Sequence, residues 1–343
     1  MKQNVARELL WPDRADIVLR IVFLNVGQGA STIVLARDRS DYKSMLIDIN
    51  LDAENKSINV PQLVSDLLDG GDLDVFVNTH PHDDHLNGLV DLADATIIKE
   101  IWHSGHKPGK KYRDAYDNLN KVIKKVKDNG GSETILIGSR QEQPFGDAFY
   151  YILAPAEYVS DDVENEDQDT RYRRIHEQCS VIRLGYGKSW VIIPGDADRD
   201  AFEKHITNYH ENKLSSVVLT APHHGSRSFF KHSEKDEPYL EGLKAIDPDY
   251  VIISSPTQTA SKHNHPHNDA LKLYEENAGK ENVLHTGQNG YSFVCDIYDD
   301  GSYSGISDDK GQLAEGYPIG KKEHISFPPV IPSRIDDRPM GWK

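Results

Sequence analysis

Cysteine is scarce in this sequence: among 343 residues only Cys179 and Cys295 are cysteines, far apart in the chain. This excludes a disulfide-rich scaffold and makes the cytoplasm the expected location. No apolar run approaches the roughly 18 residues of a transmembrane helix, so neither a membrane span nor a membrane partner is expected. The first residues, MKQNVARELLWPDRAD, carry charges through their centre and do not predict a secretory signal.

Basic residues are also fewer than acidic residues. The chain has 39 Lys and Arg residues against 55 Asp and Glu residues, which gives a formal net charge of −16. Composition alone therefore predicts no long-range attraction to nucleic acid or to an anionic membrane. A phosphate substrate would require metal ions or a local basic patch to supply positive charge.

Apolar strand-like segments alternate with amphipathic helix-like ones along most of the chain. The expected strands are 17–24, 31–36, 44–50, 74–80, 97–106, 133–139, 148–155, 179–187, 189–196, 215–226 and 249–255, followed by a hairpin over 281–304. The expected helices are 60–71, 86–95, 112–130, 199–209 and 267–279. This order predicts a layered α/β domain with a sheet core and helices outside.

Two segments depart from this rhythm. Residues 161–169 form an acidic loop that precedes the basic RYRR of 171–174. Residues 316–343 hold five of the 17 prolines and predict an extended tail. We therefore expect one main domain over residues 1–310 and a proline-rich tail over 311–343.

The densest group of chemically capable side chains is THPHDDHLNG, at positions 79–88. His80, His82, Asp84 and His85 follow a buried strand, and Pro81 favours a loop over a helix. Imidazole and carboxylate ligands suit zinc, with manganese or iron as competitors. Asp83 is expected to be solvent-facing or to lie behind the ligands.

Three later segments repeat the pattern of an apolar run that ends in metal-capable groups. Asp196 ends WVIIPGD, and the pair His223 and His224 follows VVLTAP. The segment SKHNHPHNDALKLY places His265 and His267 before a helix, where one histidine can act as an acid or stabilise an oxyanion. No nucleophile-elbow pattern surrounds the serines, and Cys179 is expected to be a core thiol.

Seven segments occur in an order that resembles the metallo-β-lactamase fold, and most of all the hydrolase domain of ComEC-type DNA-uptake proteins. They are FLNVGQGAST, MLIDIN, THPHDDHLNG, CSVIRLGYGKSWVIIPGD, APHHGS, NHPHNDALKLY and HTGQNGYSF, and the match runs from about residue 19 to about residue 300. The resemblance implies a four-layer αβ/βα sandwich with two divalent metal ions at one edge of the facing sheets. Zinc is the first expectation for these ions and manganese the second.

The resemblance also implies roles for individual residues. His80 and His82 would bind the first metal and Asp84 and His85 the second. Asp196 would bridge the two metals. His223 would complete the second site, and His265 would face the substrate phosphate. Asp84, Asp196 and His265 are thus the expected catalytic residues, and Asp48, His224 and His267 are expected behind the ligands.

Two features depart from the pattern of that branch. Asn25 and Ala30 stand beside VGQG, where aspartates are usual, which removes negative charge near the expected site. The usual histidine before the central strand has only His176 as a counterpart, at an imperfect offset. His176 is either the third protein ligand of the first metal or a loop histidine beside RYRR.

The function implied is that of a metal-dependent hydrolase, a phosphodiesterase or nuclease that acts through a metal-bridging hydroxide. The acidic composition favours a short oligonucleotide, a cyclic nucleotide or another small phosphodiester as substrate over long duplex DNA. RYRR and the lysines Lys121, Lys124 and Lys125 either form an anion-binding rim or are ordinary solvated faces. Two alternatives stay open: hydrolysis of a lactone, thioester or other carboxyl ester on the same site, and a non-catalytic module with a degraded site.

Overall fold

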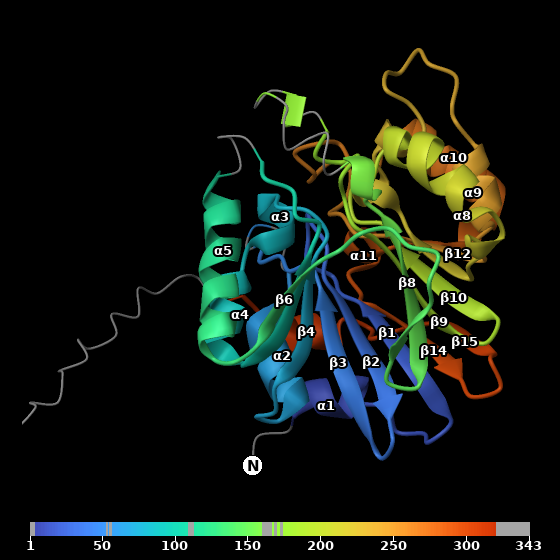
Figure 1. Ribbon diagram of the computed structural model, residues 1–343. Helices are drawn as coiled ribbons and strands as arrows, with labels where there is room; N and C mark the ends of the chain where they lie inside the picture. The colour runs from blue at the N-terminus through green and yellow to red at the C-terminus, as the bar shows by residue number, and fades with distance from the viewer. Residues whose placement is uncertain are drawn as a thin grey trace, which may run out of the picture.

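A computed structural model describes residues 4–52, 54, 57–108, 113–159, 167, 170–171 and 174–319. Two β-sheets face each other at the centre of the molecule (Figure 1). Helices cover the outer face of each sheet. This arrangement is the four-layer αβ/βα sandwich that the sequence predicts.

The first sheet has eight strands in the order β15-β14-β1-β2-β3-β4-β5-β6. Strands β3 to β6 run parallel, and the remaining pairs are antiparallel. The bounds are β1 (Ile17–Phe23), β2 (Thr32–Asp38), β3 (Asp41–Ile47), β4 (Leu73–Asn78), β5 (Ile98–His103), β6 (Ser132–Ile135), β14 (Phe293–Tyr298) and β15 (Tyr303–Asp308).

The second sheet has seven strands in the order β13-β12-β11-β10-β9-β8-β7, and β10 to β13 run parallel. Its bounds are β7 (Gln143–Phe145), β8 (Ala148–Ala154), β9 (Val181–Tyr186), β10 (Ser189–Ile193), β11 (Val218–Thr220), β12 (Tyr250–Ile253) and β13 (Val283–His285). The carboxyl ends of parallel strands are where ligand-binding residues gather in open α/β sheets. Here β4, β10 and β11 end in the motifs described above.

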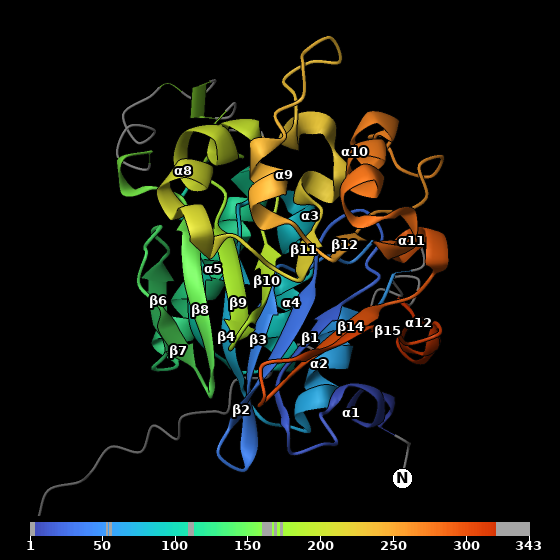
Figure 2. The same cartoon turned by 90° about the vertical axis from the view of Figure 1, so that its right-hand side faces the viewer.

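The helices form the two outer layers, seen on either side of the sheets in Figure 1, and in Figure 2 the layer with α8, α9 and α10 faces the viewer. The first sheet is covered by α1 (Val5–Leu10), α2 (Val60–Leu68), α4 (Leu89–Ala95), α5 (Arg113–Asp128) and α12 (Gln312–Gly316). The second is covered by a π-helix, η2 (Ala201–Ile206), with α8 (Thr207–His210), α9 (Glu241–Ile246) and α10 (Asn268–Ala278). The shorter turns are α3 (Asp83–Leu86), η3 (Glu211–Lys213), η4 (Pro222–Gly225), η5 (Arg227–Phe229), η6 (Lys280–Asn282) and α11 (Thr286–Asn289).

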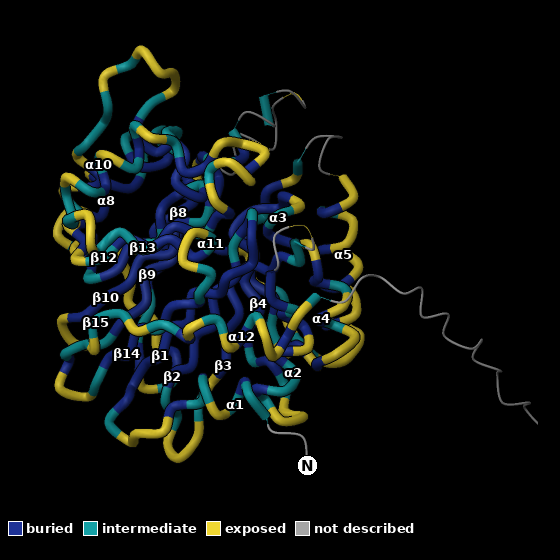
Figure 3. The backbone as a smooth tube through the Cα atoms, turned by 180° about the vertical axis from the view of Figure 1, so that it is seen from behind, coloured by how far each residue is buried: buried dark blue, intermediate teal, exposed yellow. Residues whose placement is uncertain are grey.

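Strand periodicity explains the layers. Successive side chains of a strand point to opposite faces, so each central strand supplies two apolar cores. Phe76 of β4 packs toward the helices, whereas Val75 and Val77 pack between the sheets. Ile192 of β10 packs under the second helical layer. Buried backbone therefore fills the centre of Figure 3, and exposed backbone lies at the rim.

One buried ion pair ties the first sheet together. Arg20 of β1 and Asp296 of β14 are direct cross-strand partners, each less than a tenth exposed. The guanidinium donates to both carboxylate oxygens, from Nε and Nη2, at 2.7 Å each. It also donates to the carbonyl oxygens of Leu10 and Trp11 at the end of α1. The pair thus joins strand, strand and helix at one point.

Three local predictions are corrected. The loop expected over residues 80–88 contains the helical turn α3. The helix expected over 199–209 is a π-helix that continues into α8. The hairpin expected over 281–304 is divided between the sheets, because α11 and Gly290 (φ 73°) turn the chain away after β13.

Within the predicted tail, the structure describes residues 311–319. Leu313 of α12 and Tyr317 are buried in the helix-side core, where the Tyr317 hydroxyl accepts a hydrogen bond from the Ala6 backbone N–H at 3.1 Å. The remainder of the tail and most of the acidic loop lie outside the described residues. None of the helices in the described part of the chain has the length and apolar character needed to span a bilayer.

Candidate metal centre

A first group of side chains meets at the end of β4. It comprises His80, His82, His176 and Asp196, and one ligand atom from each lies within 4.8 Å of the others. His80 is fully buried, with its Nδ1 3.2 Å from the Thr79 hydroxyl. His176 comes from the turn before β9 and Asp196 from the end of β10. The structure thus places His176 with the predicted ligands of the first metal.

The chemistry of this group fits a metal ion. The Nε2 atoms of His80 and His176 are buried and have no hydrogen-bond partner among the described residues. Burial lowers the pKa of both histidines well below the usual value, and it lowers that of His82 to about 4. Neutral imidazoles with unshared lone pairs are the form that binds a cation, which would relieve the cost of burying unpaired polar atoms.

A second group lies beside the first. Asp84, His85 and His224 each place one ligand atom within 4.8 Å of the other two. The Nε2 atoms of His85 and His224 are 3.2 Å apart, and that of His224 is 3.3 Å from Asp84 Oδ2. Burial disfavours a charged His85, but the surrounding carboxylates outweigh it and raise its pKa well above the usual value. The group therefore binds positive charge strongly.

The Asp196 carboxylate lies between the two groups. Its Oδ2 is 3.5 Å from His80 Nε2 and 3.9 Å from His176 Nε2. Its Oδ1 is 3.0 Å from His85 Nε2 and 3.4 Å from His224 Nε2. Burial opposes ionisation, but the surrounding histidines outweigh it and hold the pKa of Asp196 well below its usual range. One anionic side chain thus faces both groups, one oxygen to each.

The histidine pair after β11 is arranged differently from what the resemblance implies. His224, expected behind the ligands, belongs to the second group. His223, expected to complete that group, has its Nε2 3.4 Å from Asp196 Oδ2 and its ring 4.4 Å from that of His176. Both residues adopt left-handed backbone conformations, with φ of 50° and 57°. This turn decides which ring faces which group.

Asp48 holds His85 from behind. It follows β3 and is 1% exposed. Its Oδ2 is 2.7 Å from His85 Nδ1 and accepts from the Thr79 hydroxyl at 2.7 Å. Its Oδ1 accepts the Thr79 backbone N–H at 2.8 Å. Because Asp48 takes the proton on Nδ1, the Nε2 lone pair of His85 is directed toward the second group.

Replacing Asp48 by asparagine is therefore expected to weaken metal binding by roughly 10–100-fold at the second group, while the first group changes little. The amide accepts at only one of the two oxygen positions and carries no charge to orient His85. Calorimetric titration of the metal-free protein with Zn²⁺ measures this. Asp74→Asn is the matched control, because Asp74 accepts from Ser44 and Lys99 on the same sheet. Unchanged affinity at both groups would refute the supporting role of Asp48.

The VGQG segment packs on the backbone of the second group. The Ala30 N–H is 3.4 Å from the carbonyl oxygen of Asp84. Gly29 has a φ of 138°, and a Cβ there would overlap that same carbonyl, so glycine is required. Asn25 instead donates its backbone N–H to Ser292. Ala30 thus contacts a residue of the second group, whereas the backbone N–H of Asn25 is bonded to Ser292.

His265 lies next to the histidine pair. It is 5% exposed, and its ring centroid is 5.4 Å from that of His223 and 6.3 Å from that of His224. Burial, and then the neighbouring histidines, lower its pKa to about 2, so it is neutral. His267 lies further out, where its Nδ1 accepts the Arg227 backbone N–H at 3.1 Å.

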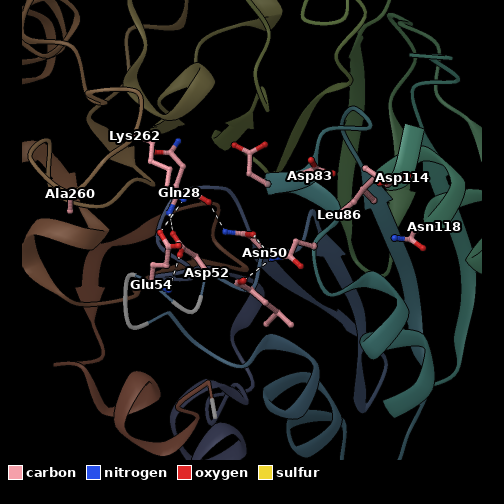
Figure 4. A pocket seen from close by; sticks show the side chains of 14 residues that line it. Gln28, Asn50, Asp52, Glu54, Asp83, Leu86, Asp114, Asn118, Ala260 and Lys262 are labelled. Atoms are coloured by element: carbon pink, nitrogen blue, oxygen red, sulfur yellow. Dashed lines mark hydrogen bonds and ion pairs between the residues drawn. The ribbon is translucent and has the colours of Figure 1, made fainter. Parts of the chain in front are cut away.

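A cleft of about 470 Å³ opens beside Asp84 (Figure 4). Its lining brings together five distant segments of the chain and includes the carboxylates of Asp52, Glu54, Asp83, Asp84 and Asp114. Lys262 is the only basic residue among the described residues that line it, and its Nζ is 3.0 Å from a Glu54 oxygen. Burial, and then the charges of Asp84 and Asp114, raise the pKa of Asp83. The cleft is strongly acidic.

The predicted basic rim is largely neutralised by its own surroundings. Lys124 pairs with Asp128 and Lys125 with Asp94. Of RYRR, Arg171 and Arg174 are described, and Arg174 Nε is 2.6 Å from a Glu177 oxygen. These contacts favour the interpretation of solvated faces over an anion-binding rim.

Sequence reasoning missed several residues around the site. The cleft residues Asp52 and Asp114 lie in segments with no motif, and only the fold brings them to Asp84. Cys179, correctly predicted as buried, has its Sγ 3.6 Å from His80 Nδ1. No sequence signal marks these neighbours, since each is an ordinary residue of its element.

Comparison with known proteins agrees with this geometry. Residues 40–197 match the family described as the Metallo-beta-lactamase superfamily. No curated protein matches the chain significantly. Among solved structures, a diphosphatase of the PhnP family is 12% identical, with 78% of this chain and 94% of that chain covered and a TM-score of 0.37. A β-lactamase from Chitinophaga pinensis is 13% identical, with 78% and 98% covered and a TM-score of 0.33.

Residues 40–197, a little under half of the chain, thus match the metallo-β-lactamase superfamily, and the two-sheet architecture is consistent with that superfamily's sandwich. This superfamily consists of metal-dependent hydrolases that typically bind divalent metals. The described residues contain two His and Asp groups that could hold metal ions of the kind this superfamily typically binds.

Proposed function

We propose that this protein is a phosphodiesterase that uses two divalent metal ions, zinc first and manganese second. The observation that carries the proposal is the position of Asp196, with one oxygen toward each group of ligands. His80, His82 and His176 would hold one ion, and Asp84, His85 and His224 the other. Bound there, the pair of ions would supply a water nucleophile active near neutral pH and neutralise charge that develops on phosphoryl oxygens.

The protein's own side chains do the positioning. The Asp196 carboxylate faces both groups of ligands, and Asp48 fixes the orientation of the His85 ring. His265 is neutral and buried beside His223 and His224. A neutral imidazole can donate a hydrogen bond to a phosphoryl oxygen as negative charge grows there. We assign that role to His265.

The cleft supports a small substrate. Long nucleic acid binds mainly through phosphate contacts to lysine and arginine. The described lining offers five carboxylates and one lysine that is already paired. A cyclic nucleotide or a dinucleotide places one phosphodiester at the ligand groups and no further phosphate in the cleft. The resemblance to ComEC-type hydrolase domains supports a phosphodiester over a carboxyl ester.

A substrate panel tests the proposal. The Zn²⁺- or Mn²⁺-loaded protein is assayed on bis(p-nitrophenyl) phosphate, a dinucleotide, long single-stranded DNA, a lactone and a thioester. Phosphodiesters are expected to be hydrolysed, with higher kcat/KM for the dinucleotide than per bond of long DNA.

The His82→Ala/Asp84→Ala double variant is the control, because it removes one ligand from each group. Equal activity in this variant and the wild type would refute the metal site. Turnover of the lactone or thioester without phosphodiester hydrolysis would assign the site to carboxyl esters instead.

A further inference from the structure

His176 is held differently from the other candidate ligands. His80, Asp196 and His224 follow strand ends, whose backbone is fixed by a parallel sheet. His176 instead lies in a turn over residues 174–178, three residues before Cys179. Among the described residues, two local backbone hydrogen bonds close this turn, from Gln178 N to Arg174 O at 3.0 Å and from Cys179 N to His176 O at 3.3 Å. The direction of the His176 ring therefore depends on side chains around the turn.

Glu177 anchors one side of the turn. It is 7% exposed, and one carboxylate oxygen is 2.6 Å from Arg174 Nε. The other oxygen is 2.8 Å from His205 Nε2. His205 belongs to the π-helix η2, which covers the second sheet. The carboxylate thus links two residues of the turn, Glu177 and Arg174, and also connects the turn to the outer helical layer through His205.

Gln178 anchors the opposite side. It is 2% exposed, and its Oε1 is in hydrogen-bond contact with Nδ1 of His106, in the loop after β5. Its Nε2 donates to the carbonyl oxygen of Val159 at 3.4 Å. Because β5 belongs to the first sheet, Gln178 connects the turn to the other half of the sandwich.

We infer that Glu177 and Gln178 are positioning residues that set the His176 ring toward His80 and Asp196 and so determine affinity at the first group. This inference rests on the proposed metal site. Losing a partner that orients a metal-binding histidine costs roughly 10–100-fold in metal affinity. The effect is confined to one group, because the second group contains no residue from this turn.

Zn²⁺ titration of the metal-free protein against a chromophoric chelator tests the inference through two dissociation constants. The variants His176→Ala and His224→Ala assign one constant to each group. Glu177→Gln and Gln178→Ala are each expected to weaken the first constant roughly 10–100-fold and to leave the second within about 2-fold. Thermal unfolding of each metal-free variant shows that it is folded.

Glu203→Gln is the matched control. Glu203 lies on η2, as His205 does, and like Glu177 it pairs with an arginine, here Arg199 at 2.6 Å. It is expected to leave both constants unchanged. An unchanged first constant in both test variants, or equal weakening of both constants, overturns the inference. A wild-type protein that binds no Zn²⁺ refutes the proposed function itself, and this inference with it.

Discussion

Replacing Asp196 by alanine is expected to remove metal from both groups at once. Metal content should fall from about two equivalents per chain toward none, and hydrolysis by at least about 10³-fold. The reason is geometric: Oδ2 lies 3.5 Å from His80 Nε2, and Oδ1 lies 3.0 Å from His85 Nε2. Elemental analysis of protein dialysed against Zn²⁺, together with the phosphodiester assay, measures the loss.

Two sets of control variants show whether the loss at both groups is specific to Asp196. His80→Ala and His224→Ala should each lose about one equivalent, since each residue belongs to one group. Asp198→Asn should keep both ions, because this neighbouring carboxylate accepts the Ala201 backbone N–H and belongs to neither group. Two equivalents retained in Asp196→Ala would show that the carboxylate does not connect the groups.

The second large effect is expected in stability. Arg20→Met or Asp296→Leu alone should lower the free energy of unfolding by roughly 3–5 kcal/mol, because each leaves the partner charge buried without compensation. The double variant should recover most of this loss, since it removes both charges and keeps apolar volume. Urea unfolding of the metal-free protein measures all three.

Arg37→Met provides the comparison. Its ion pair with Asp147 has a similar length, 2.8 Å, but the Asp147 side chain is 45% exposed. Exposed pairs contribute roughly 0–1 kcal/mol, so this change should be small. If Arg20→Met were no more damaging than Arg37→Met, burial would not govern the strength of the pair.

The sequence predicts a structural feature best where a single strand or helix determines it. His80 and Asp196 each follow an apolar strand, so their places at strand ends follow from the pattern. Their convergence follows from the facing of the two sheets, because β4 belongs to the first sheet and β10 to the second. The layers follow from the alternation of Val75, Phe76 and Val77. The place of the histidine pair depends on local geometry that the sequence does not mark. His223 and His224 both have left-handed backbone conformations, and His224 lies in the second group.

Features that join distant segments left no trace in the sequence. Arg20 and Asp296 are 276 positions apart, and neither stands out in its strand. The acidic cleft assembles from five segments whose charges are individually ordinary. The sequence leaves the role of His176 open, because its turn is joined to the fold by contacts of Glu177 with His205 and of Gln178 with His106, which lie far away in the sequence.

The division of the ligands between the two halves of the sandwich has a consequence for how the molecule comes apart. His80, His82, Asp84 and His85 belong to the half built on the first sheet, and His176, Asp196 and His224 to the other. Each proposed ion would therefore be bound by residues of both halves and would cross-link the two halves. A ligand that binds only the folded state adds about 2.7 kcal/mol at 100 times its dissociation constant. Chelation would thus remove a stabilising connection between the two halves and lower the free energy of unfolding of the metal-bound protein.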